Sequence, residues 1–206
     1  MRVIVITGGL GSGKSTAAQY LATKGAVALD LDEVAAKLMG PGSALLAQVA
    51  DEFGGDEILL ADGRLDRAAL ANLAFASPQA VQRLNAIVHP AVAHEVGESI
   101  DMLRLMPQPP LAVILEVPLL AEAPVFGELS DGVIALVAPE DVRMRRALDR
   151  GMAEEDARRR IRNQATDAER AALSDRVIVN DGSEERLFQE LTEFWEENVA
   201  IGGATS

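Results

Sequence analysis

The chain has 206 residues, a length that fits one α/β domain with embellishments, and it carries 32 acidic against 19 basic side chains. The net charge of −13 argues against a general role in coating nucleic acid or anionic membranes, so neither is an expected partner. The sequence contains no cysteine, no signal-peptide pattern and no long uncharged apolar run, which excludes a disulfide framework and predicts a soluble, cytoplasmic protein.

The N-terminal segment predicts a strand followed by a helix and a second strand. Residues 2–7 are mostly β-branched and apolar, as in a strand buried on both faces of a parallel sheet. Glycines end this run, and apolar residues then recur at helical spacing from Lys14 to Lys24. Residues 26–30 predict the second strand and residues 33–38 a helix. A β-α-β alternation therefore begins at once.

The rest of the chain continues this alternation after a helical interruption. Residues 43–104 are predicted to be mostly helical, with breaks at Gly54-Gly55, at residues 61–63 and at His89-Pro90. Later elements are predicted as strands at 111–116, 132–137 and 176–179, arginine-bearing helices at 140–149 and 153–163, a helix at 183–199, and a frayed tail at 202–206. Five strands alternating with helices predict an α/β fold with a doubly wound, five-stranded parallel sheet.

We expect residues 1–206 to form a single unit with three parts. The core comprises residues 1–42, 105–139 and 174–200. Residues 43–104 form a helical insertion, and residues 140–173 form an arginine-rich helical lid.

The run from Gly8 to Ser15, Gly-Gly-Leu-Gly-Ser-Gly-Lys-Ser, matches the pattern G-x-x-x-x-G-K-[ST] between a predicted strand and a predicted helix. Glycines let the backbone N–H groups point at phosphate oxygens, and the helix adds its positive N-terminal end. Lys14 is expected to reach the β- and γ-phosphates, and Ser15 to place its hydroxyl on Mg²⁺. The predicted nucleotide contacts in this loop are Gly9, Gly11, Ser12, Gly13, Lys14, Ser15 and Thr16.

Two carboxylates at the ends of predicted strands are candidates for chemistry. Asp32 follows the second strand, where it could take the proton of a hydroxyl that attacks the γ-phosphate; the alternative is a helix N-cap. Asp30 would point the same way on an extended segment, or be a loop charge. Glu116 ends the third strand and is expected to hold Mg²⁺ or its water, unless it is only an edge charge.

The second half of the chain contains an arginine-rich stretch. Ten arginines and seven acids lie between Arg143 and Arg176. This excess of positive charge suggests a local anionic ligand, and the alternative is solvated helices with intrahelical ion pairs. Arg143, Arg146, Arg150 and Arg160 follow the fourth strand, where nucleotide kinases place a mobile lid that neutralises the transferred phosphoryl group.

Several further segments carry a resemblance that covers nearly the whole chain. In addition to the glycine-rich loop and Asp30-Leu31-Asp32, they are Gly63-Arg64-Leu65-Asp66-Arg67, Leu84 to Pro90, Val117-Pro118-Leu119-Leu120-Ala121-Glu122, Arg160 to Gln164, and Ser174 to Gly182. Together they resemble the dephospho-CoA kinase family, which phosphorylates the ribose 3′-hydroxyl of dephospho-CoA to give coenzyme A.

The resemblance implies ATP and Mg²⁺ as cofactors and dephospho-CoA as substrate, with residues 43–104 as the domain that receives this acceptor. By position it makes Asp32 the base, Lys14 and Ser15 the phosphate and metal contacts, and Arg146 and Arg150 the lid arginines. Its remaining implied contacts are Asn180 for the nucleotide, and Arg67, His89 and Glu122 for the acceptor. His89 could instead close a helix before proline, and Arg67 could instead pair with Asp66.

The chain departs from the family pattern at a few positions. Ala35-Ala36-Lys37 lacks the usual arginine, which Lys37 replaces only in part. Glu116 stands where aspartate is more frequent, Ala121 replaces a common phenylalanine, and the segment after Arg150 is one residue shorter. These departures bear on acceptor affinity and lid geometry more than on the reaction.

Other functions remain open from the residues alone. The chain could be another small-molecule P-loop kinase that acts on a nucleoside or nucleotide, or a nucleotide-binding module without catalysis. A regulatory GTPase is disfavoured because the sequence contains no Asn-Lys-x-Asp segment to recognise guanine. Nothing in the sequence fixes the oligomeric state, and a monomer is slightly favoured.

Overall fold

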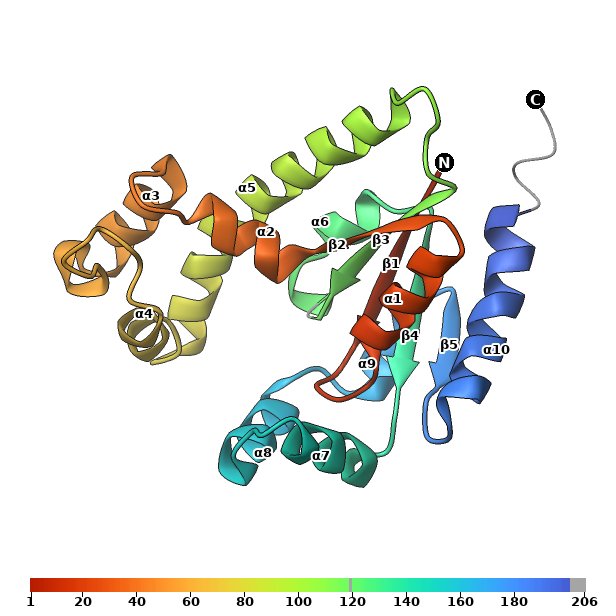
Figure 1. Cartoon of the computed structure of the whole chain (residues 1–206). Helices are drawn as coiled ribbons and strands as arrows, with labels where there is room; N and C mark the ends of the chain where they lie inside the picture. Colours follow the sequence, from red (N-terminus) through yellow and green to blue (C-terminus); the bar gives the residue numbers. More distant parts are fainter. Residues whose placement is uncertain (119, 201–206) are drawn as a thin grey trace. The chain divides into compact units, whose positions relative to one another are not determined.

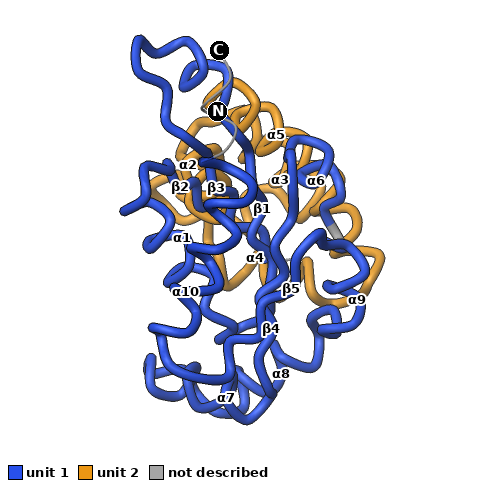
Figure 2. The backbone as a smooth tube through the Cα atoms, turned by 90° about the vertical axis from the view of Figure 1, so that its right-hand side faces the viewer, with its two compact units in different colours: residues 1–30, 100–206 blue, residues 31–99 orange. Residues whose placement is uncertain are grey.

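The computed structural model describes residues 1–118 and 120–200 (Figure 1). The chain divides into two compact units, one formed by residues 1–30 together with the chain from residue 100 onward, and the other by residues 31–99 (Figure 2). The first unit contains the sheet and the glycine-rich loop. The second unit is helical.

A five-stranded parallel sheet forms the centre of the first unit. Its strands are β1 (Arg2–Gly8), β2 (Ala26–Asp30), β3 (Ala112–Val117), β4 (Gly132–Val137) and β5 (Arg176–Val179). They lie in the order β2-β3-β1-β4-β5, so the chain moves to one side of β1 first and to the other side later. This reversal makes the sheet doubly wound, as predicted, and places the carboxyl end of β1 where such folds bind ligands.

The two faces of this sheet are covered, which explains the continuous apolar runs of the central strands. Val5 of β1 lies opposite Leu115 of β3 and Val133 of β4 in register. Alternate residues of each strand point to opposite faces, and both faces of β1 are buried. A parallel sheet needs this double cover.

Helices α1 (Lys14–Thr23) and α10 (Glu184–Trp195) pack on one face of the sheet (Figure 1). Leu21 of α1 and Leu191 of α10 are fully buried there against Ile4 and Ile134. The other helical elements of the unit are the end of α5 (Pro78–Arg104), η2 (Leu120–Glu122), α6 (Val125–Glu128), α7 (Glu140–Asp149), α8 (Glu154–Asn163), α9 (Asp167–Ala172) and the π-helical η3 (Glu196–Ala200). Helix α9 contacts β1 and β4.

The second unit has its own apolar core, built on Val49, Phe53, Ile58 and Leu70. Its helices are α2 (Leu31–Leu38), α3 (Ala44–Phe53), η1 (Gly55–Ile58), α4 (Arg67–Ala74) and most of α5 (Pro78–Arg104). None of the described helices has the length and apolar character that a membrane span requires.

Three local predictions were wrong. The predicted break at His89-Pro90 is absent, because α5 continues through Pro90. Proline removes one backbone hydrogen bond from a helix, but Ile87 and Val88 before it pack on the core and Val92 after it is buried. Packing on both sides of Pro90 holds the helix together. The alternative that His89 closes a helix is therefore wrong too.

The third correction concerns Asp30 and Asp32. Helix α2 begins at Leu31, two residues earlier than predicted, so the segment that joins the two aspartates is not extended. Asp32 lies in the first turn of this helix and Asp30 ends β2. At the other end of the chain, the predicted C-terminal helix changes to π-helical geometry at Glu196. The predicted frayed tail lies outside the described residues.

Candidate functional site

The glycine-rich loop joins β1 to α1 in the form that binds phosphate. Gly11 and Gly13 have φ values of +73° and +100°, a region that side chains rarely adopt. The Ser12 N–H donates to the Gly9 carbonyl at 3.2 Å, which closes a turn. Gly13 is the N-cap of α1 and offers no side chain to its first turn, so the N–H groups there are available to an anion.

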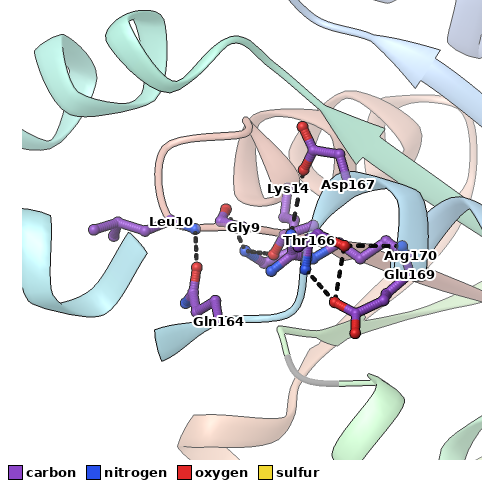
Figure 3. A network of polar contacts seen from close by, with 9 residues as sticks. Gly9, Leu10, Lys14, Gln164, Thr166, Asp167, Glu169 and Arg170 are labelled. Carbon is purple, nitrogen blue, oxygen red and sulfur yellow. Dashed lines mark hydrogen bonds and ion pairs between the residues drawn. The ribbon is translucent and has the colours of Figure 1, made fainter. Parts of the chain in front are cut away.

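Lys14 folds back over the start of this loop. Its Nζ donates to the carbonyl oxygen of Gly8 at 2.9 Å and to that of Gly9 at 3.3 Å. Figure 3 labels Lys14 and Gly9 at this site. A lysine that follows the loop glycines at this spacing is the phosphate-binding lysine of P-loop proteins. The ammonium group is thus held against the backbone of the loop.

Ser15 and Glu116 come together from different elements. The Ser15 hydroxyl at the start of α1 donates to Oε2 of Glu116 on β3 at 2.9 Å. Among the described residues, no group of three or more histidine, cysteine, aspartate or glutamate side chains is arranged so that it could hold a metal ion. One hydroxyl and one carboxylate suit a cation such as Mg²⁺, which keeps waters and phosphate oxygens in its shell. The two predicted metal ligands therefore fit this ion.

Asn180, just after β5, anchors the other half of the loop. Its side chain is buried, and its Nδ2 donates to the Ser12 carbonyl at 2.8 Å. Arg146 of α7 donates to Oδ1 of Asn180 at 3.2 Å, to its backbone carbonyl at 3.1 Å and to the Gly11 carbonyl at 3.2 Å. These bonds connect the arginine-rich segment to the loop.

The same residues border an open pocket of about 250 Å³ in the first unit. Its lining comprises Gly13, Thr16, Arg146, Asp149, Arg150, Asn180, Glu184 and Leu187. Burial is the main cause that lowers the pKa of the Arg146 guanidinium, and the nearby charges of Arg145 and Arg150 lower it further. Arg150 ends α7 and is exposed. The predicted contacts Thr16 and Asn180 therefore face one cavity with both predicted lid arginines.

The arginines of helix α8 fit the alternative interpretation of the arginine-rich stretch, which is a solvated helix with intrahelical ion pairs. Arg158 pairs with Glu154 at 2.6 Å, and Arg159 pairs with Asp156, all on the exposed surface. Each of these intrahelical pairs contributes little to stability.

Gln164, which ends α8, has a contact that the sequence did not predict: its Oε1 accepts the Leu10 N–H at 2.8 Å (Figure 3).

Three further predicted residues, Arg67, His89 and Asp32, belong to the helical unit, and Glu122 belongs to the first unit. Arg67 is exposed at the start of α4, where the Asp66 carboxylate accepts the N–H groups of Ala68 and Ala69 at 3.0 Å as the helix cap. His89 is half-buried in α5, and burial lowers the pKa of its imidazole. The side chain of Glu122 lies outside the described residues. Asp32 occupies the first turn of α2.

Arg67 also borders an apolar pocket of about 220 Å³ within the helical unit, formed with Met39, Leu65, Leu70, Ala71, Ala74, Phe75 and Leu84. Lys37, which was expected to replace only in part an arginine of the resembled family, pairs with Glu95 at 3.8 Å. Its side chain is 80% exposed, so this contact contributes little to stability.

Comparison with known proteins decides the family. The family model for dephospho-CoA kinase matches residues 2–186. The chain belongs to the dephospho-CoA kinase family. A curated dephospho-CoA kinase from Corynebacterium diphtheriae is 41% identical over 197 residues, which cover 95% of this chain and 96% of that protein. One from Thermobifida fusca is 41% identical over 198 residues, with 96% of each chain covered.

Solved structures share the fold of this chain. The crystal structure of the protein TT1252 from Thermus thermophilus matches this chain with a TM-score of 0.74 and 34% sequence identity. The match covers 96% of this chain and 97% of that one. A dephospho-CoA kinase from Campylobacter jejuni has a TM-score of 0.69 at 22% identity, covering 97% and 98% of the two chains. The second likeness is one of fold alone.

Proposed function

We propose that this chain transfers the γ-phosphoryl group of ATP to the ribose 3′-hydroxyl of dephospho-CoA, giving coenzyme A and ADP. The observation that carries this proposal is the family match over residues 2–186, in a chain whose P-loop, Lys14 and Ser15–Glu116 pair are all in place. We further propose that it acts in the cytoplasm, as a monomer.

The groups of the first unit are assigned to the donor nucleotide. In this proposal the loop N–H groups and Lys14 bind the phosphates, and Thr16 and Asn180 border the pocket that takes the rest of the nucleotide. Arg150 is exposed at this pocket and is proposed to be the lid arginine that acts on the phosphates. Arg146, by contrast, is bonded to the loop through the Gly11 carbonyl. Arg146 contributes its positive charge while it keeps Gly11 and Asn180 in place.

The groups assigned to the acceptor are Asp32, Arg67, His89 and Glu122. Asp32 is proposed to accept the proton of the ribose hydroxyl as its oxygen attacks phosphorus, which raises the nucleophilicity of that oxygen. Arg67 supplies a positive charge beside an apolar pocket, and this charge suits the phosphates of the acceptor. His89 and Glu122 follow from the family resemblance.

Mg²⁺ is proposed as the metal, held by Ser15 directly and by Glu116 directly or through water. When bound, it would neutralise charge on the nucleotide phosphates. Replacing Glu116 by glutamine is expected to raise the Mg²⁺ concentration for half-maximal activity about tenfold, because the site loses its carboxylate charge. A Mg²⁺ titration of turnover measures this. Glu128→Gln, which removes an exposed carboxylate on α6, is the matched control and should leave the titration unchanged.

The proposed reaction is tested by incubating the purified protein with ATP, Mg²⁺ and dephospho-CoA and measuring product mass. A gain of one phosphoryl group on the acceptor is expected. ADP release stimulated by nucleoside monophosphates but not by dephospho-CoA would indicate a different small-molecule kinase. ATP binding by calorimetry without turnover on any acceptor would indicate an inactive nucleotide-binding module.

A further inference from the structure

Two arginines outside the assigned site are buried in the first unit. Arg143 of α7 is 9% exposed and Arg170 of α9 is 2% exposed. Arginine is rarely buried to this degree unless its charge is paired. The sequence grouped Arg143 with the lid arginines and gave Arg170 no role, so their burial calls for a physical reason.

Their hydrogen bonding is incomplete. Arg170 has one carboxylate partner, Asp167, which accepts from Nη1 at 3.3 Å. Within the described part of the chain, Nε and Nη2 of Arg170 and Nε of Arg143 have no hydrogen-bond partner, although all three atoms are buried. A buried donor without a partner is costly, and a charged one more so.

The two guanidinium groups are also close enough to affect one another. Burial is the main cause that lowers the pKa of Arg170, Asp167 raises it, and the charge of Arg143 lowers it. Glu169 contributes a weaker favourable charge, but it is exposed and engaged in the capping box with Thr166. Two buried positive charges thus lie close together, and Arg170 has one close carboxylate, Asp167. An additional anion would stabilise this arrangement.

This pair lies at the phosphate-binding loop. A Cβ atom added to Gly9 would collide with Nη1 of Arg143, so the guanidinium rests directly on the backbone there. At Gly11 a Cβ would come within 2.9 Å of the Arg143 Cα. The carbonyl of Gly9 also accepts from Lys14 at 3.3 Å. Helix α9, which carries Arg170, contacts β1, the strand that leads into the loop.

We propose that Arg143 and Arg170 form a cationic site for the terminal phosphoryl group of the bound nucleotide, beside Gly9. Arg143 contacts the phosphoryl oxygens, and Arg170 lies behind it and adds positive charge. The γ-phosphate is favoured over the acceptor's phosphates because Gly9 is also the residue that Lys14 contacts, and Lys14 in a P-loop reaches the β- and γ-phosphates. The inference rests on the proposed use of ATP and adds a residue pair that distinguishes ATP from ADP.

The test is calorimetric binding of the non-hydrolysable ATP analogue AMP-PNP, of ADP and of dephospho-CoA, each with Mg²⁺ where a nucleotide is used. Arg143→Gln keeps a polar side chain at the loop but removes the charge. We expect it to weaken AMP-PNP binding about tenfold, since a charge-assisted hydrogen bond is lost, and to change ADP and dephospho-CoA binding less than twofold. Arg170→Lys keeps the positive charge. It should change the affinities for AMP-PNP, ADP and dephospho-CoA less than Arg143→Gln does.

Arg158→Gln is the matched control, because it removes an equally charged but exposed side chain from the neighbouring helix α8. It should bind all three ligands like the parent protein. Equal losses for AMP-PNP and ADP in Arg143→Gln would indicate support of the loop and overturn the proposal. So would unchanged binding of AMP-PNP, or a loss confined to dephospho-CoA. Failure of the parent protein to phosphorylate dephospho-CoA would refute the proposed acceptor, yet leave this comparison of nucleotides intact.

Discussion

Replacement of Asp32 by asparagine is expected to lower the turnover of dephospho-CoA about 10²–10⁴-fold, the usual range for the loss of a general base. Asparagine has nearly the same shape but cannot accept the ribose proton. The affinity for nucleotide should stay nearly unchanged, because Lys14 and the loop amides are untouched. Steady-state kinetics with dephospho-CoA, together with calorimetry of AMP-PNP binding, measure the two quantities separately.

Glu33→Gln provides the control for Asp32→Asn. Glu33 and Asp32 both lie in the first turn of α2, where a negative charge stabilises the positive end of the helix by about 0.3–1 kcal/mol. Each substitution therefore removes one charge from the same turn, with a similar small effect on thermal stability. Only Asp32→Asn should abolish most of the turnover. Full activity in Asp32→Asn would remove this residue from its role as base.

The sheet and its loop could be predicted because the signals are local. Residues 2–7 and 132–137 are short apolar runs of the kind that only a sheet covered on both faces can bury, and both become strands. The loop motif specifies its own conformation through Gly11 and Gly13, whose positive φ values few other residues would tolerate. A pattern within ten residues was sufficient in each case.

The contacts around the loop could not be predicted, because they join residues far apart in the sequence. Asn180 binds the carbonyl of Ser12 across 168 positions, and Gln164 binds the N–H of Leu10 across 154. Neither side chain shows a local pattern that would identify its partner. Arg146 was predicted as a lid arginine, but its bonds to Gly11 and Asn180 depend on how α7 packs against the loop.

The error at His89-Pro90 has the same origin. The local preference is for a helix to end before proline, because a proline inside a helix costs about 3 kcal/mol relative to alanine. Apolar packing on both sides of Pro90 opposes this preference: Val92 is buried, and Ile87 and Val88 are partly buried. Full burial of such a side chain contributes roughly 1.5–3 kcal/mol, and partial burial contributes less. Tertiary packing therefore decides the outcome, and it is invisible in a short window of sequence.

Lys14→Ala is expected to affect both nucleotide binding and phosphoryl transfer, unlike Asp32→Asn. The ammonium group is assigned to the β- and γ-phosphates in the ground state and to the charge that develops during transfer. Its removal should lower turnover about 10²–10³-fold, the range for one lost charge-stabilising donor, and weaken AMP-PNP binding measurably. Kinetics at saturating dephospho-CoA and calorimetry give both values.

The structure also predicts how Lys14→Ala changes the free protein. Two hydrogen bonds to the Gly8 and Gly9 carbonyls are lost, at about 1 kcal/mol each, so the thermal midpoint should fall slightly. Lys24→Ala is the matched control: Lys24 follows the other end of α1, and its Nζ lies 5.4 Å from the ring centroid of Tyr20. That variant loses the same charge from the same helix and should keep its nucleotide affinity and turnover. If Lys14→Ala behaves like Lys24→Ala, the loop does not bind the phosphates through this lysine, and the assignment of the nucleotide site must be abandoned.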